Sequence, residues 1–195
     1  MKKLLIAVFA LISIGASAQE NSVLLYGNVN IRSSKGLDGT QSSTFIINPG
    51  IGYQFTKNLT AGINLGIDAD KTETSGTSNN YNKNFIFSAG PFLRYTKPLN
   101  DLFSAYAQLN ASYLSSTAKP YTGSEVKWNG FGTSLIPALS INVHNGLALN
   151  FNIGGIDFTS VGPKDGTSNI NSFNLTFGQS VGIGIQKNFM CKKKK

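Results

Sequence analysis

Few side chains in this sequence have the type and spacing that catalysis or metal binding requires. The 195 residues include one histidine, His144, and one cysteine, Cys191, which leaves no internal disulfide. No group of His, Cys and acidic residues has the spacing of a metal site. The glycines of Gly182-Ile183-Gly184 lie in a strand-like pattern and open no helix, so they do not fit a nucleotide-binding loop. We therefore expect no catalytic residue, no metal and no cofactor.

The first 18 residues have the pattern of a cleaved signal peptide. Lys2 and Lys3 precede an apolar stretch from Leu4 to Ile14, and Ala16-Ser17-Ala18 fits the small-residue cleavage site. The apolar stretch is too short to span a bilayer as a helix; the alternative is a buried first helix. Cleavage after Ala18 would leave a chain of one domain's length.

The stretch from Phe173 to Phe189 alternates between two kinds of residue. Its odd positions are mostly Phe, Leu, Val and Ile, whereas its even positions are Asn, Thr, Gly, Ser and Gln. Such alternation predicts a β-strand with one apolar and one polar face. Strands in soluble domains usually have about 5–6 residues, so this length indicates lipid on the apolar side and a lumen on the polar side.

Seven stretches upstream share this alternation, so that eight strands are predicted. The eight cover residues 23–32, 45–55, 59–68, 85–95, 103–113, 131–143, 147–158 and 173–189. The long polar connections are Ser33–Ser43, Ala69–Lys83, Leu114–Asn129 and Thr159–Asn171, and the short ones are Thr56–Asn58, Lys97–Asp101 and His144–Gly146. Long and short connections alternate, as in bacterial outer-membrane barrels, whose periplasmic turns are short.

The predicted fold is therefore all-β: an eight-stranded antiparallel up-and-down transmembrane β-barrel over residues 19–189. We expect it in the bacterial outer membrane with both termini periplasmic, followed by a basic periplasmic tail at residues 190–195. Gly154-Gly155 indicates a bulge that resets the register. Pro49, Pro91 and Pro137 recur inside even-numbered strands, and we interpret them as bends or bulges of a repeated hairpin, because proline removes a ladder donor.

The residues around two of these prolines resemble a known family. The relevant stretches are Asn48–Tyr53, Leu59–Gly66, Gly90–Tyr95 and Gly146–Gly155. They look like the porin-like outer-membrane β-barrel family of small eight-stranded barrels. The resemblance covers essentially all of the predicted mature chain. It implies a fold and a location, and it implies no particular activity.

The polar face should fill the lumen, because an eight-stranded barrel is only wide enough for side chains. Tyr26, Tyr106 and Arg94 share this inward parity. So do Arg32 and Asp68, both near the extracellular ends of their strands, where they could form an ion pair across the lumen. One interpretation is a gate or ligand contact; the other is two charges that neutralise each other in a plugged lumen.

Membrane-embedded barrel acyl-transferases and lipid A deacylases resemble this architecture and rely on a histidine near the outer surface. His144 lies at a predicted periplasmic turn, so that role does not transfer to it. Asp68 and Asp157 are the carboxylates near the outer end that could do acid–base work. We expect a non-enzymatic surface or structural protein, with a lipid-modifying enzyme as the less favoured hypothesis.

Aromatic residues recur near both ends of the predicted strands. The outer set comprises Phe45, Phe85, Tyr113 and Phe131, and the inner set comprises Tyr53, Tyr95, Phe103 and Phe189. Two such sets predict the aromatic girdles of a membrane barrel. The alternative is the core of a β-sandwich, in which aromatic residues would gather in mid-strand.

Charge gives little indication of a macromolecular ligand. Loss of Lys2 and Lys3 lowers the formal net charge from +8 to +6, and four of those charges are Lys192–Lys195. Nucleic acid is therefore not an expected partner. The expected partners are outer-membrane lipid and, during assembly, periplasmic chaperones and the barrel-insertion machinery; the protein should be a monomer. An alternative remains, a soluble periplasmic ligand-binding β-barrel whose apolar face points inward.

Overall fold

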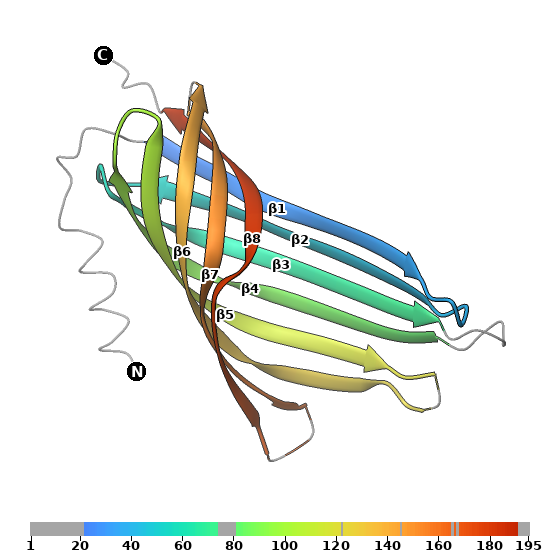
Figure 1. The fold of residues 1–195 in the computed structure, drawn as a ribbon. Coiled ribbons are helices and arrows are strands. Elements are labelled where there is room, and N and C mark those ends of the chain that lie inside the picture. The colour runs from blue at the N-terminus through green and yellow to red at the C-terminus, as the bar shows by residue number, and fades with distance from the viewer. Residues whose placement is uncertain are drawn as a thin grey trace.

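The computed structural model describes residues 22–73, 81–121, 123–144, 146–164, 166 and 168–190. These residues form eight antiparallel strands that pair in sequence order and close into a barrel through β1 and β8 (Figure 1). The strands are β1 (Ser22–Lys35), β2 (Gln41–Gln54), β3 (Leu59–Glu73), β4 (Tyr81–Pro98), β5 (Phe103–Lys119), β6 (Val126–His144), β7 (Leu147–Pro163) and β8 (Ile170–Met190). Among these residues, the structure contains no apolar helix of membrane-spanning length. The predicted fold class is confirmed; the predicted signal peptide lies outside the described residues.

The apolar face of each strand points outward. Leu65 and Ile63 on β3 are exposed, whereas Gly66, of the opposite parity on the same strand, is buried. The buried side chains of the barrel are mostly small or amide residues, such as Ser140 and Asn110. This arrangement excludes the alternative in which the Phe, Leu and Ile face surrounds an internal ligand, and the closed sheet excludes the β-sandwich.

The strands extend well into the stretches predicted as long loops. β3 continues to Glu73 and β4 begins at Tyr81, although residues 69–83 were expected to be one polar connection. The other three long stretches are shortened in the same way, to residues 36–40, 120–125 and 164–169. The alternation of apolar and polar side chains stops where both faces of a strand meet water. Backbone hydrogen bonds between strands do not require apolar side chains, so the strands continue beyond that point.

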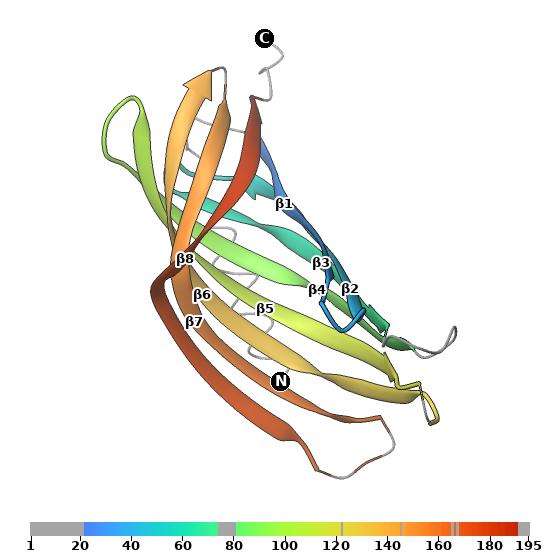
Figure 2. The same cartoon turned by 45° about the vertical axis from the view of Figure 1, so that its right-hand side comes forward.

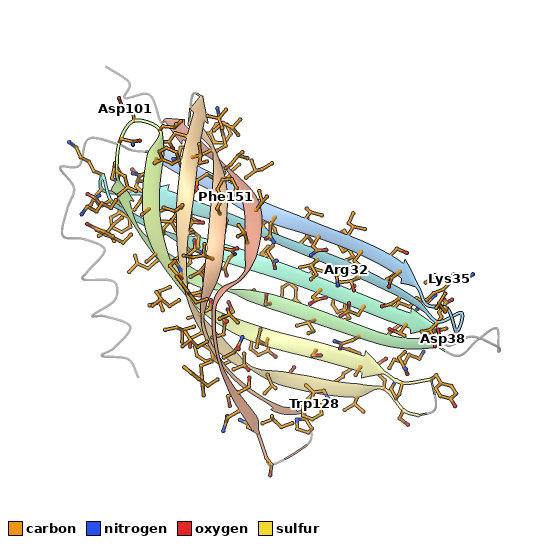
Figure 3. All side chains as sticks on the ribbon, in the orientation of Figure 1. Arg32, Lys35, Asp38, Asp101, Trp128 and Phe151 are labelled. Atoms are coloured by element: carbon orange, nitrogen blue, oxygen red, sulfur yellow. The ribbon has the colours of Figure 1, made fainter. Side chains whose placement is uncertain are left out.

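The barrel has two distinct ends. The short-turn end carries residues 55–58, 99–102 and 146 together with Ser22 and Met190, and the loop end carries the other strand ends, such as Lys35, Glu73 and Tyr81. Figure 3 shows Asp101 at the short-turn end and Lys35 and Asp38 at the loop end. β8 continues to Met190, which pairs with Ser22, so the barrel ends one residue later than predicted.

The three mid-strand prolines interrupt the sheet on one side only. Pro49 on β2 has a partner in the register with β1, Gly27, but none in the described register with β3. Pro91 and Pro137 repeat this arrangement, each paired with the preceding strand and unpaired toward the following one. A missing N–H explains the gap, because proline cannot donate to the ladder. Only the strand with Pro137 also shifts its register there.

The predicted bulge at Gly154 is confirmed, and it is larger than expected. Between β7 and β8 the register passes from Asn152–Gly182 to Gly154–Phe177, so residues 178–181 of β8 lie opposite a single residue of β7. Gly154 has a φ of +127°, and a Cβ atom there would collide with the carbonyl oxygen of Thr176. Glycine is therefore required at this position.

The sheet is closed over only part of its height. β1 and β8 pair from Ser22–Met190 to Gly27–Ile185, and no further pair between them occurs among the described residues. Figures 1 and 2 show β1 and β8 diverging toward the loop end. Phe173 and Phe177 on β8 are 69% and 72% exposed, compared with 45% for Phe85 inside the sheet. We call this opening the split.

Candidate functional site in the barrel lumen

Arg94 is the centre of the lumen at the short-turn half of the barrel. It lies on β4 with inward parity and is 2% exposed. Its Nε donates to Oε1 of Gln108 on β5 at 2.8 Å, and its Nη1 donates to Oε1 of Gln186 on β8 at 2.8 Å. Hydrogen bonds from a charged donor are stronger than neutral ones, so these two contacts hold the guanidinium across the lumen.

Three aromatic rings surround the same guanidinium. The Arg94 Cζ lies 4.2 Å from the ring centroid of Tyr106, 4.5 Å from that of Tyr26 and 5.9 Å from that of Phe92. Tyr26 and Phe92 also contact each other edge to face, with centroids 5.3 Å apart. Ring faces attract a cation most strongly when water is excluded, so they help to compensate the burial of this charge.

Hydrogen bonds connect this centre to other strands. Gln108 donates from Nε2 to Tyr26 Oη at 2.8 Å and to Asn110 Oδ1 at 2.7 Å. Asn64 on β3 donates to the same Asn110 oxygen at 2.7 Å. Two further bonds are Asn110 Nδ2 to Ser134 Oγ at 2.8 Å and Gln186 Nε2 to Ser140 Oγ at 3.3 Å. The network thus ties β1, β3, β4, β5, β6 and β8 together and fills this level of the lumen.

The buried charge of Arg94 has no carboxylate partner among the residues that the structure describes. Among the described residues, the ion pairs are Lys71–Glu73 and Lys127–Glu125, both toward the loop end. Amide oxygens and ring faces therefore take the place of a counter-ion. A buried cation compensated only by dipoles favours the approach of an anion or of another hydrogen-bond acceptor.

A polar cavity of about 360 Å³ lies next to the Arg94 network. Its walls are mostly amides, hydroxyls and glycines. The lining residues are Tyr26, Gly27, Asn28, Asn48, Asn64, Leu65, Ser88, Arg94, Tyr106, Gln108, Asn110, Ser112, Ser134, Ile136, Asn150, Asn152, Gly182, Ile183 and Gly184. Asn150 is 6% exposed, and its Oδ1 has no hydrogen-bond partner. The lumen is thus filled by side chains at the level of the Arg94 network and contains a cavity next to it.

The predicted ion pair between Arg32 and Asp68 is not formed in this structure. Arg32 is exposed on the part of β1 that borders the split (Figure 3). Asp68 lies on β3, where its Oδ1 is buried without a hydrogen-bond partner. The two strands are not neighbours, because β2 lies between them. Shared inward parity therefore did not bring these charges together.

The other residues considered for chemistry lie apart from each other. His144 ends β6 at the short-turn end, and the glycines of Gly182-Ile183-Gly184 lie within β8 as predicted. Asp157 is on β7, four strands from Asp68 on β3. Among the described residues, no three His, Cys, Asp or Glu side chains are grouped so that they could hold a metal ion. Cys191 and the lysines after it lie outside the described residues.

The eight predicted girdle residues are all exposed on the outer surface. They are Phe45, Phe85, Tyr113, Phe131, Tyr53, Tyr95, Phe103 and Phe189. The register places Tyr53 and Phe189 on either side of Val23, and it places Tyr113 directly opposite Phe131. Their role at the membrane interfaces stays a prediction.

The sequence pattern placed Arg94 on the inward face but did not identify it as the centre of the lumen. A signal was present: Arg94 shares its parity with Phe92, Tyr26 and Gln186, which it contacts. Those contacts join strands that are far apart in the chain. The positions of these residues along the barrel axis depend on the stagger of the strands, and the alternation of side chains does not determine that stagger.

A family model described as an outer membrane protein beta-barrel domain matches residues 4–180. The chain belongs to this family. It is accordingly an integral outer-membrane β-barrel, and the outward apolar surface is the surface that meets lipid. The predicted location in the bacterial outer membrane is confirmed.

Several solved structures match the chain at low sequence identity. Neisserial surface protein A has 16% sequence identity and a TM-score of 0.48, with 86% of this chain and 97% of that chain covered. Ail of Yersinia pestis, in complex with the heparin analogue sucrose octasulfate, has 12% identity and a TM-score of 0.42, with 88% and 99% covered. The translocator domain of NalP from Neisseria meningitidis has 14% identity and a TM-score of 0.45, with 89% and 65% covered. No curated protein sequence matches the chain.

Proposed function

We propose that this outer-membrane barrel is a non-enzymatic surface or structural protein whose lumen does not conduct ions. The observation that carries the proposal is the Arg94 network, which joins six strands across the lumen by side-chain contacts. Interiors of eight-stranded barrels are only wide enough for side chains. A cation held at this level also opposes the passage of other cations by direct repulsion.

The residues around the cavity support a role without catalysis. Activation of a hydroxyl nucleophile needs a base within hydrogen-bond reach. The hydroxyls of Ser88, Ser112 and Ser134 line the cavity, whereas its described lining contains no histidine and no carboxylate. Binding of a polar group is the chemistry that amides, hydroxyls and one guanidinium support best.

We place the short-turn end and both termini in the periplasm. Bacterial outer-membrane barrels have short periplasmic turns and longer extracellular loops, and the observed connections follow that asymmetry. The partners in this proposal are outer-membrane lipid and, during assembly, periplasmic chaperones and the barrel-insertion machinery. The protein acts as a monomer and binds no nucleic acid.

Single cysteines at the two ends test this orientation in intact cells. In a Cys191→Ser background, Asp38→Cys at the loop end should react with a membrane-impermeant maleimide, and Asp101→Cys at the short-turn end should not. Labelling of both positions after outer-membrane permeabilisation is the control. If Asp101→Cys reacts in intact cells and Asp38→Cys does not, the orientation is reversed.

Planar-bilayer recording with the purified protein tests the blocked lumen. The expected result is no steady unitary current, in contrast to a sixteen-stranded porin recorded under the same conditions. Folding of the purified barrel is checked separately by its heat-dependent shift on a gel, and incorporation into the lipid by flotation of the reconstituted protein with liposomes. Reproducible large unitary steps from inserted protein would contradict the proposal and indicate a transport function.

A further inference from the structure

The split begins directly beside the buried arginine. Gly27–Ile185 is the last residue pair between β1 and β8, and Tyr26–Gln186 is the pair before it. Arg94 contacts both members of that earlier pair, through the Tyr26 ring at 4.5 Å and Gln186 Oε1 at 2.8 Å. Among the described lining residues of the cavity, Arg94 is the one with a formal charge, and it lies where the barrel wall starts to open.

A second, apolar cavity lies on the outer side of the same point. This groove has a volume of about 380 Å³. It is lined by Gly27, Asn28, Val29, Ile47, Pro49, Ile183, Gly184 and Ile185. Four of these residues, Gly27, Asn28, Ile183 and Gly184, also line the polar lumen cavity. The polar and apolar cavities thus meet across one short stretch of β1 and β8.

Unpaired backbone beside the split requires a polar neighbour. β1 continues to Lys35 and β8 begins at Ile170, beyond the last pair that joins them. Backbone groups without partners are not tolerated against lipid, but they are tolerated where they line a water-filled cavity. The lumen cavity reaches the split at Asn28 and Gly184, so it can supply that water. A polar path therefore leads sideways from the lumen toward the lipid.

We infer that the lumen cavity and the groove over the split form one binding site for a single-chain amphiphile from the membrane, with its anionic headgroup at Arg94 and its alkyl chain in the groove. The headgroup is assigned by charge, because the described residues of the cavity lining include a guanidinium and no carboxylate. The Oδ1 atom of Asn150, which has no hydrogen-bond partner, can accept a hydrogen bond from a water molecule in the same cavity. The alkyl chain of the amphiphile is assigned to the groove because the side chains of Val29, Ile47 and Ile185 that line it are apolar.

The amphiphile site goes beyond the proposed non-conducting barrel. Ligand binding is tested by NMR, whereas the blocked lumen is tested by conductance. The chain contains two arginines, Arg32 and Arg94. Arginine-selective ¹⁵N labelling of the protein in non-ionic detergent therefore gives two Nε–H signals, of which Arg32→Lys removes one and assigns the other. Arg32 is exposed and serves as an internal reference.

Oleate is the probe, at a fixed detergent concentration. The expected result is a saturable shift of the Arg94 signal with oleate, while the Arg32 signal stays in place. Oleyl alcohol, which has the same chain without the charge, and acetate, which has the charge without the chain, should each leave the Arg94 signal unmoved. An equal shift with either compound overturns the amphiphile assignment, and so does the absence of any shift with oleate.

Two matched substitutions locate the alkyl chain. Val29→Trp fills the groove, whereas Leu109→Trp makes a comparable change on β5, away from the split; these positions are 58% and 51% exposed. Val29→Trp should weaken the oleate titration about tenfold, as expected when roughly two methylene groups lose their burial. Leu109→Trp should leave it unchanged. Equal effects of the two variants, with both barrels folded by heat modifiability, would contradict a chain in the groove, whatever the conductance experiment shows.

Discussion

The two halves of this barrel differ in how far the sheet closes and in how the lumen is filled. In the short-turn half, all eight strands pair with both neighbours, and Arg94 with its hydrogen-bond partners fills the lumen. In the loop half, β1 and β8 separate, and the lumen contains a cavity. The same alternation of inward polar and outward apolar residues runs through both halves. Alternation therefore determines which face a residue occupies, but it does not determine whether the sheet closes.

A register shift between β7 and β8 accompanies this difference. The bulge at Gly154 leaves residues 178–181 of β8 opposite a single residue, and Gly178 there has a φ of +73°. Bulges bend a strand and increase its local twist. Figure 2 shows β8 bending between its two halves as β1 continues in its own direction. The register shift between β7 and β8 thus lies just beyond the point where the pairing between β1 and β8 ends.

The largest effect is expected when the closed half loses its last strand pairing. Deletion of Ile183–Lys195 removes every residue of β8 that pairs with β1. Each backbone group left unpaired in lipid costs several kcal/mol, so we expect this deletion to abolish membrane insertion. Deletion of Cys191–Lys195 alone should leave a folded, heat-modifiable barrel, because the strand ends at Met190. Membrane fractionation distinguishes the two; failure of the shorter deletion would mean that the tail is part of the fold.

A smaller effect is expected from the two arginines, one in each half. Arg94→Ala leaves the acceptor oxygens of Gln108 and Gln186 buried without their donor, and an unsatisfied buried group costs about 1–3 kcal/mol. Arg32→Ala changes an exposed side chain, for which about 0.5 kcal/mol or less is typical. Urea unfolding of each variant in detergent or liposomes measures both values. Equal losses for the two variants would contradict the contrast between a filled half and an open one.

Much of this architecture could be predicted from the sequence, because it depends on local patterns. Period-2 alternation gave eight strands and their outward faces, and the pair Gly154-Gly155 gave the bulge. Strand ends were predicted too short, since residues such as Lys71 and Lys83 break the alternation yet still pair with each other in the ladder. A polar side chain ends an apolar face, and it does not end a β-sheet.

The site could be predicted only in part. Inward parity was available for Arg94 as well as for Arg32 and Asp68, and nothing in the pattern ranked one above the others. Which inward residues meet depends on the stagger of strands that are distant in the chain, as with Arg94 on β4 and Gln186 on β8. The position of the split likewise depends on the registers of successive strand pairs around the barrel, including the shift at Gly154 and the last β1–β8 pair at Gly27.

Cysteine cross-linking between β1 and β8 tests whether the sheet is closed over only part of its height. In a Cys191→Ser background, Leu25→Cys with Lys187→Cys probes a residue pair of the closed half. Ile31→Cys with Val181→Cys probes the positions that would pair if the same register continued into the loop half. A disulfide requires Cα atoms within about 7 Å. After mild oxidation of outer membranes, we expect a disulfide in the first pair and none in the second; equally efficient disulfides in both pairs would show that β1 and β8 stay paired to the loop end and that the sheet has no split.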